Sequence, residues 1–140
     1  MMIIGIDHGY GFTKTHNCTF ASGVARFDNE PGVKERVLEY GGGYYTVGCM
    51  PDGIVANKTI NDDYYILTLA AIAEELIHRK ITCANVTLAA GLPLTRFGNE
   101  KSSFKDYLLR EKAKPIEYKY QGKKFNIRIE DVDLYPQGYA

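Results

Sequence analysis

An aspartate, two glycines and a lysine stand close together near the start of the chain. Asp7 ends an apolar run that begins at Met2; Gly9 and Gly11 follow it, and Lys14 lies in the next segment. A carboxylate at the end of a buried strand can hold a hydrated divalent cation. Glycines let a turn approach a ligand closely, so that backbone N–H groups can point at phosphate oxygens. A lysine on the returning strand adds a positive charge near the same phosphates, and phosphoryl transfer depends mainly on such positioning and charge neutralisation.

The same stretch has a simpler interpretation as a hairpin turn. Asp7 would then hydrogen-bond to its own backbone, as aspartates in turns commonly do, and the residues alone leave both interpretations open. Two other phosphate-binding motifs are excluded. The chain contains no G-x-x-x-x-G-K-[ST] loop, and the segment after the glycines does not read as the helix that a dinucleotide-binding fingerprint requires.

The composition is that of one globular domain without a marked affinity for nucleic acid. The chain has 140 residues, enough to bury a hydrophobic core. Its 17 Lys and Arg balance its 17 Asp and Glu, so it lacks the basic excess typical of proteins that bind duplex DNA. No segment approaches the about 18 apolar residues that cross a bilayer, and the apolar start is too short for a signal peptide. We therefore expect a cytoplasmic protein with no membrane partner.

The three cysteines and three histidines do not form a recognisable metal or disulfide pattern. Cys18, Cys49 and Cys83 are odd in number and widely spaced, which fits neither a disulfide framework nor a zinc site. We expect free and mostly buried thiols. His8, next to Asp7, is expected to be a surface or turn residue.

The first part of the chain predicts short strands. We expect a strand over residues 2–7, a second over 12–20 that forms a hairpin with the first, and a third over 23–27. A glycine-rich turn between 36–40 and 44–48 predicts a further hairpin.

Helical patterns alternate with strands in the second part. A helix is expected from the capping residue Asn61 to about residue 80, with one apolar face that is formed by Tyr65, Leu69, Ile72 and Leu76. A strand over 85–92 is apolar along 86–90, which indicates cover on both faces.

A second helix, over 95–112, should turn Phe104 and Leu108 inward. It precedes a hairpin of strands over 116–120 and 124–134. An antiparallel three-strand start followed by helix–strand units is the α/β layout of ribonuclease H-like domains, in which helices flank a mixed sheet.

The run from Gly5 to Lys14, GIDHGYGFTK, resembles the first phosphate-binding motif of the actin superfamily. Segments at 22–25, 63–71, 90–94 and 135–140 resemble, in the same order, ParM/StbA-type actin-like proteins, which segregate plasmids. The likeness extends over nearly the whole chain. It implies that residues 1–140 form an N-terminal actin-like, ribonuclease H-like domain with a strand-hairpin insertion at about 33–50.

The resemblance also implies roles for particular residues. Asp7 would bind the Mg²⁺ of a nucleotide, and Lys14 would contact phosphate. Backbone amides of Gly9, Tyr10, Gly11 and Phe12 would bind the β- and γ-phosphates. Gln137 falls where such proteins carry a glutamate or glutamine that orients the attacking water, and a neutral amide would act there by positioning.

For the whole protein, the resemblance implies an ATPase that binds ATP or GTP with Mg²⁺ and assembles into filaments. DNA would be contacted only indirectly, through an adaptor. The C-terminal nucleotide-binding domain, which supplies the other wall of the nucleotide cleft, is absent from these 140 residues. We therefore expect the chain by itself to fold but to bind nucleotide weakly or not at all and to show no measurable hydrolysis.

Two other functions stay open. Small ribonuclease H-like nucleases of the Holliday-junction-resolvase type also open with a strand that ends in an aspartate. They need two or three carboxylates around metal ions, with Asp7 as the first, and neither a late acidic motif nor a closing helix with its own aspartate is evident. The third possibility is a non-enzymatic actin-like adaptor that only binds partners.

Overall fold

The computed structural model describes residues 2–9, 11–32, 36–49, 63–92, 97–111 and 114–136. The elements run in the order β1 Met2–His8, β2 Phe12–Lys14, β3 Thr19–Ala21, β4 Gly23–Phe27, β5 Val37–Tyr40, β6 Gly43–Cys49, α1 Asp63–His78, β7 Cys83–Leu92, α2 Phe97–Leu108, β8 Ile116–Tyr120 and β9 Lys123–Pro136.

All the described strands belong to one mixed sheet. Its nine strands lie in the order β3-β2-β1-β7-β9-β8-β5-β6-β4. β1, β7 and β9 are parallel neighbours, and the other pairs are antiparallel. The predicted α/β, ribonuclease H-like architecture with an antiparallel three-strand start is confirmed.

The third strand of that start is not the one predicted from the sequence. Residues 12–20 were expected to be a single strand, but they divide into β2 and β3 around a turn closed by a hydrogen bond from the Thr15 amide to the Cys18 carbonyl (2.8 Å). The third strand is therefore Thr19–Ala21, and Gly23–Phe27 pairs with β6 instead. Residues 12–20 have the composition of a strand, so the sequence does not reveal the turn between β2 and β3, which side-chain hydrogen bonds stabilise.

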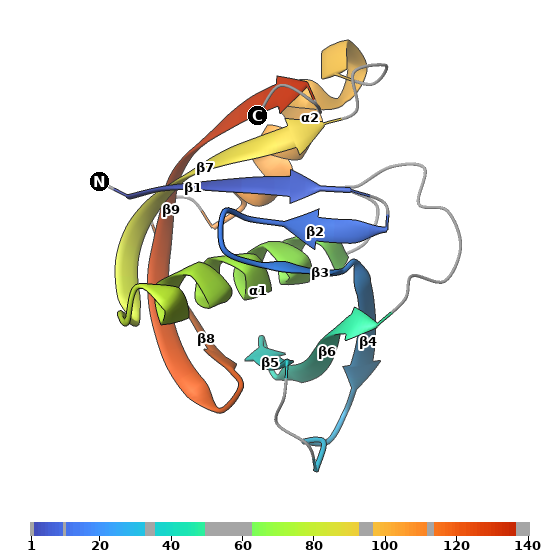
Figure 1. Ribbon diagram of the computed structural model, residues 1–140, viewed down its shortest axis with the longest axis vertical. Helices are drawn as coiled ribbons and strands as arrows, with labels where there is room; N and C mark the ends of the chain where they lie inside the picture. Colours follow the sequence, from blue (N-terminus) through green and yellow to red (C-terminus); the bar gives the residue numbers. More distant parts are fainter. Residues whose placement is uncertain are drawn as a thin grey trace.

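The sheet curves around helix α1 and its two ends meet. β3 and β4 lie at opposite ends of the strand order, yet only Ser22 separates them in the sequence. Figure 1 shows α1 crossing the middle of the molecule, with β2 and β3 on one side of it and β5 and β8 on another. Ser22 therefore marks the seam at which the curved sheet closes.

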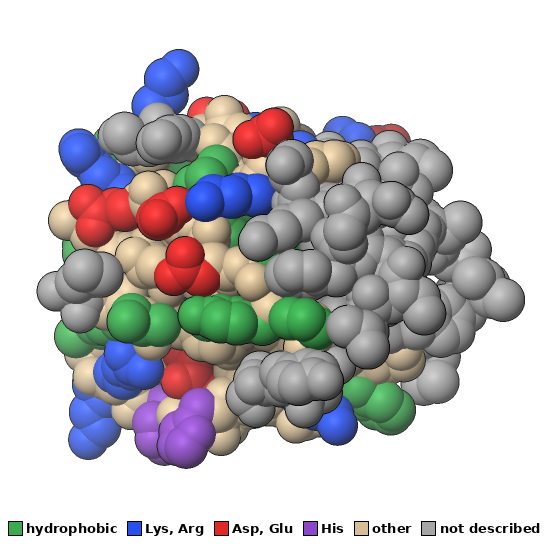
Figure 2. Space-filling view, turned by 90° about the horizontal axis from the view of Figure 1, so that it is seen from above, with side chains coloured by type: hydrophobic (Ala, Val, Ile, Leu, Met, Phe, Trp, Pro, Cys, Tyr) green, Lys and Arg blue, Asp and Glu red, His purple; other side chains and the backbone are tan. Residues whose placement is uncertain are grey.

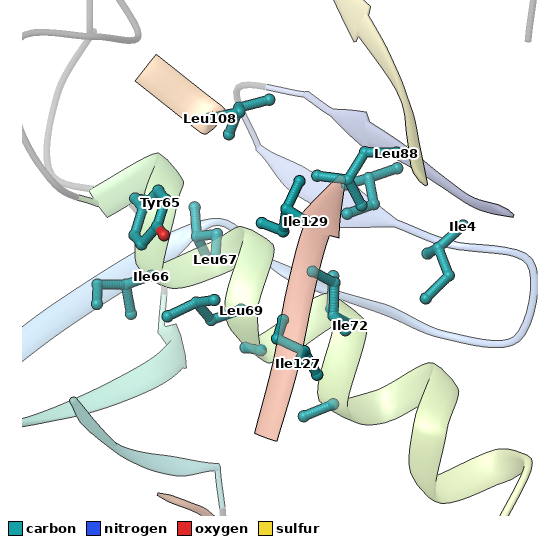
Figure 3. Packing of buried hydrophobic residues seen from close by; sticks show 14 of the residues in the cluster. Ile4, Tyr65, Ile66, Leu67, Leu69, Ile72, Leu88, Leu108, Ile127 and Ile129 are labelled. Carbon is teal, nitrogen blue, oxygen red and sulfur yellow. The ribbon is translucent and has the colours of Figure 1, made fainter. Parts of the chain in front are cut away.

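Helix α1 is buried around most of its circumference. The predicted face of Tyr65, Leu69, Ile72 and Leu76 is buried, but so are Ile66, Leu67, Ala70, Ala71 and Ala73. The expectation of one apolar face was thus too narrow, because the sheet encloses the helix. Figure 3 shows its side chains meeting those of the strands, including Leu88, Ile127 and Ile129. No helix in the described ranges is long and apolar enough to span a membrane.

Two-residue turns join both predicted hairpins. Gly41 and Gly42 have φ values of 61° and 83°, and Gln121 and Gly122 have values of 53° and 79°. Positive φ at both central residues is the mark of the type I′ turn, whose twist matches that of paired strands. The glycines of these turns made both hairpins predictable.

Helix α2 and strand β7 largely follow the prediction. Phe104 and Leu108 are buried as expected, and on β7 the inward residues Val86 and Leu88 are fully buried. Ala89, on the opposite face of β7, is only half-buried. The strand is therefore covered completely on one face and partly on the other.

The cysteines that the structure describes are free, as expected, but they are less buried than expected. Cys83 is exposed and Cys18 is half-buried. Cys83 is the first residue of β7 and faces outward, where no element covers it among the described residues. Burial and the neighbouring Glu74 raise the pKa of the Cys18 thiol to about 11, so this thiol stays protonated near neutral pH.

Candidate functional site

The antiparallel pairing of β1 and β2 places Asp7 directly opposite Lys14. Cβ atoms of such partners lie about 5 Å apart. Both side chains line a cavity of about 620 Å³ on the face of the sheet that points away from α1. Among the described residues, its lining consists of Gly5, Ile6, Asp7, Lys14, Thr15, His16, Ala89 and Tyr135. Two of the residues singled out in the sequence thus share one hollow.

This cavity lies at the carboxyl ends of the parallel strands. Asp7 of β1 pairs with Gly91 of β7, which pairs in turn with Tyr135 of β9. Gly91, between them, has no side chain, and both Asp7 and Tyr135 line the cavity. Ligands of open α/β sheets bind in the crevice at the carboxyl ends of the strands, so the cavity occupies the expected position.

The Oδ1 atom of Asp7 is buried and accepts no hydrogen bond from any residue that the structure describes. A buried carboxylate oxygen normally has a partner, so this atom is available to a cation or to a water molecule bound to one. The described residues contain no cluster of three or more His, Cys, Asp or Glu side chains that could hold a metal ion. Mg²⁺ in nucleotide sites commonly has only one or two carboxylates, with phosphate oxygens and water completing its shell. The residues therefore fit a nucleotide-bound Mg²⁺ better than a metal held by the protein alone.

The glycines after Asp7 form a tight connection to β2. A Cβ atom on Gly9 would lie 2.7 Å from the carbonyl oxygen of Phe12, whereas one on Gly11 would meet nothing within 4 Å. Gly9 thus allows a close backbone approach, and Gly11 faces open space. Gly9, Gly11 and Phe12 are not among the residues that line the cavity, although they come directly after Asp7 in the sequence. Tyr10 and Gln137 lie outside the described residues, so their predicted roles stay predictions.

His8 is a core residue, and the expectation of a surface or turn histidine was wrong. Strand β1 continues through residue 8, so the alternation of side chains turns His8 toward α1, where it is fully buried. Its Nε2 lies 2.7 Å from the Thr68 hydroxyl, which donates its own hydrogen to the Tyr64 carbonyl. Nε2 must therefore carry a hydrogen and donate it to Thr68.

The turn that follows Lys14 is held by a buried carboxylate of α1. Glu75 accepts hydrogen bonds from the Thr15 hydroxyl (2.8 Å), the Asn17 amide (2.9 Å) and the Asn17 side chain (3.0 Å). The Arg79 guanidinium lies 3.8 Å away. Burial alone would raise the pKa of Glu75, but these hydrogen bonds and Arg79 outweigh it and lower the pKa. Glu75 thereby fixes the turn that carries Thr15 and His16 to the cavity.

Sequence reasoning missed several residues of the site. Tyr135 could have been found, because alternation along β9 puts it on the outer face. Glu75 gave a weaker signal, because it is one of two adjacent carboxylates, with Glu74, in an otherwise mostly apolar helix. Nothing in the sequence alone pointed to His16.

The outer surface of the molecule mixes apolar and charged side chains. Ile3 and Tyr135 are exposed by 62% and 42% on the face that holds the cavity. Seen from above, hydrophobic side chains form a row, with acidic side chains mostly on one flank and histidine on the other (Figure 2). The described part of this face thus presents both apolar and charged side chains.

The acidic residues of β9 do not join Asp7 in a metal cluster within the described part of the chain. An irregularity in the pairing with β7 leaves Glu130 and Asp131 both exposed. Asp131 lies 3.5 Å from Lys105 of α2. The group of carboxylates that the nuclease interpretation requires is therefore not formed by these residues.

The sequence profile of the N-terminal domain of actin-like proteins matches residues 5–139. The chain belongs to the actin-like protein family. By sequence alone, no curated protein matches it.

Solved structures of actin-like proteins share the fold. AlfA from the B. subtilis plasmid pLS32, solved as a filament, matches with a TM-score of 0.74 and 16% identity over 99% of this chain and 57% of AlfA. The archaeal actin homologue Ta0583 matches with 0.73 and 23% over 99% and 46%. Apo ParM of pSK41 matches with 0.69 and 19% over 96% and 49%. The chain thus spans about half the length of the structures it matches.

Proposed function

We propose that the chain is the first domain of an actin-like ATPase that forms filaments and segregates plasmid or other DNA. The observation that carries this proposal is the cavity shared by Asp7 and Lys14 in a chain of the actin-like family, with no hydrogen-bond partner for the Asp7 Oδ1 atom among the described residues. A carboxylate and a lysine on one hollow, next to a glycine turn, match the charge pattern of a nucleotide's phosphates and their metal.

Related structures support nucleotide binding and assembly. Ta0583 is also known in complex with ADP, AlfA as a filament bound to AMPPNP, and Alp12 as a filament. We extend both properties to the protein that contains this chain: it binds ATP or GTP with Mg²⁺ and self-associates. Contact with DNA would pass through an adaptor, in the cytoplasm.

Each residue of the site has a distinct part in this proposal. Asp7 orients the water shell of the bound Mg²⁺, and Lys14 neutralises phosphate charge. The amides of residues 9–12 bind phosphate oxygens, and Gln137 orients the attacking water. The metal supplies neutralisation of the charge that develops during phosphoryl transfer. The second wall of the cleft comes from a C-terminal domain outside residues 1–140.

Nucleotide-dependent assembly of the protein that carries this chain tests the proposal. Light scattering should rise on addition of Mg·ATP or Mg·GTP. The rise should be abolished in Asp7→Asn and strongly reduced in Lys14→Ala, with circular dichroism unchanged. Asp133→Asn is the matched control, because Asp133 is an exposed aspartate on the same face of the sheet. Assembly of Asp7→Asn at the control's level would overturn the role of Asp7, and no response of the unmodified protein to either nucleotide would overturn the function.

A further inference from the structure

Ser22 makes three hydrogen bonds that hold the connection between β1 and β2. Its hydroxyl donates to the Gly9 carbonyl (3.0 Å), and its amide donates to the Gly11 carbonyl (3.0 Å). The Thr13 hydroxyl lies 2.9 Å from the Ser22 hydroxyl. Because Ser22 has given its only hydroxyl hydrogen to Gly9, Thr13 must be the donor in this contact. The result is a chain of hydrogen bonds from Thr13 through Ser22 to Gly9.

These bonds fix the backbone of the proposed phosphate loop on both sides of residue 10. A planar trans peptide places its N–H opposite its C=O. Holding the Gly11 carbonyl toward Ser22 therefore directs the Phe12 N–H the other way. Thr13 is fully buried and Ser22 is 8% exposed. Loss of either hydroxyl would leave a polar partner without water to replace it.

Ser22 also occupies the seam of the curved sheet. It follows β3, which pairs with β2, and it precedes β4, which pairs with β6 at the other end of the strand order. A shift of the loop that moves Ser22 must therefore move the first residues of β4. No other described residue contacts the loop and joins both end strands in this way.

We propose that Ser22 is a positioning residue, which holds the phosphate loop in its binding shape and couples the loop to β4. This inference rests on the proposed nucleotide function. It predicts that a nucleotide at the loop perturbs β4, which does not line the cavity, and that the perturbation depends on the Ser22 hydroxyl.

Amide NMR titration of the 140-residue chain with Mg·ADP tests the inference, since NMR detects weak binding. In the unmodified chain, Phe12 and Lys14 should shift together with Gly23 and Val24. Ser22→Ala should raise the dissociation constant about fivefold, the effect of one lost hydrogen bond, and should reduce the shifts at Gly23 and Val24, because only the bond from the Ser22 amide to Gly11 then remains. Ser22→Thr, which keeps the hydroxyl, should restore them. The exposed Ser103 of α2 supplies the control Ser103→Ala, with no change.

The outcomes separate this inference from the proposed function. No shifts in the unmodified chain up to the solubility limit of the nucleotide would overturn the inference, whereas the proposed function is decided by the assembly of the protein that carries this chain. Shifts at the loop and at β4 that are the same in Ser22→Ala would overturn the role of Ser22 alone. If Ser22→Ala fails to fold, Thr13→Val decides, because it removes the donor to Ser22 and keeps the bond to Gly9. An unchanged dissociation constant in a folded Thr13→Val would then overturn the inference.

Discussion

Asp7 and His8 are neighbours in the sequence, but they belong to opposite sides of the molecule. The alternation of β1 turns Asp7 toward the open face and His8 into the core against Thr68. A substitution at residue 8 therefore disturbs packing against α1, whereas one at residue 7 changes the charge of the cavity. The two effects can be separated experimentally even though the residues share a strand.

Glu75 makes stability depend on pH. In Glu75→Gln, the side-chain amide would turn a donor toward groups that already donate, so we expect a loss of about 3 kcal/mol in the free energy of unfolding at pH 7. The folded-state pKa of Glu75 lies below its unfolded value. Its contribution is therefore complete above the unfolded pKa of about 4.3, and it is lost as the pH falls through the lowered folded pKa.

Urea denaturation at several pH values measures this effect. The difference between the unmodified chain and Glu75→Gln should be full at pH 7 and shrink below about pH 4. Glu117→Gln, at an exposed position on β8, should stay within about 0.5 kcal/mol throughout. A difference that does not change with pH would show that Glu75 acts through its shape and not its charge.

Gly9 and Gly11 should respond differently to the same substitution. Gly9→Ala forces a methyl group against the Phe12 carbonyl oxygen, 2.7 Å away, and should destabilise the chain by about 1–3 kcal/mol. Gly11→Ala places its methyl in open space and should change stability by less than about 1 kcal/mol. Midpoints of urea unfolding compare the two variants. Equal losses would mean that the loop is not as tight at Gly9 as the structure shows.

At the scale of elements, the sequence predicted what local chemistry determines. The glycines at Gly41 and Gly122, which adopt positive φ in the structure, predicted the two hairpins. The helical spacing of apolar residues predicted α1 and α2. The division of residues 12–20 into two strands could not be predicted, because the turn is held by Glu75, which lies far along the chain. The closure of the sheet at Ser22 could not be predicted either, because it depends on the pairing of β3 and β4 with strands that are distant in the order of the sheet. In the site, Asp7 and Lys14 were identifiable from their motif, but their partners came from distant strands.

The turn of the β8–β9 hairpin offers a stabilising substitution. Gln121 adopts φ of 53°, a conformation that costs a residue with an ordinary side chain about 1 kcal/mol and that asparagine accepts more readily. Gln121→Asn creates an Asn-Gly pair, the preferred type I′ sequence, and should raise stability by about 0.5–1 kcal/mol. Gln121→Val, which is β-branched, should lower it. Thermal unfolding monitored by circular dichroism decides, and a fall in the midpoint for Asn would contradict the turn type.

For the molecule as a whole, the open position of the cavity predicts weak binding. Asp7, Lys14 and the loop provide one wall, and residues 1–140 correspond to about half of the related structures. Few contacts remain to offset the entropy lost on association. The chain alone should bind Mg·ATP with a dissociation constant above about 100 μM in calorimetry, with no measurable hydrolysis. Micromolar affinity would show that this wall is sufficient.

The position of β9 has a consequence for the synthesis of the protein. β9 is the middle strand of the nine described strands and the last of them along the sequence. Until it leaves the ribosome, β1, β2, β3 and β7 have no strand to join them to β4, β5, β6 and β8. The apolar surface of α1 therefore stays partly uncovered in the nascent chain until β9 has emerged. Chaperones that shield such surfaces would act on it before β9 emerges, and slow codons before residue 123 would prolong its exposure to aggregation.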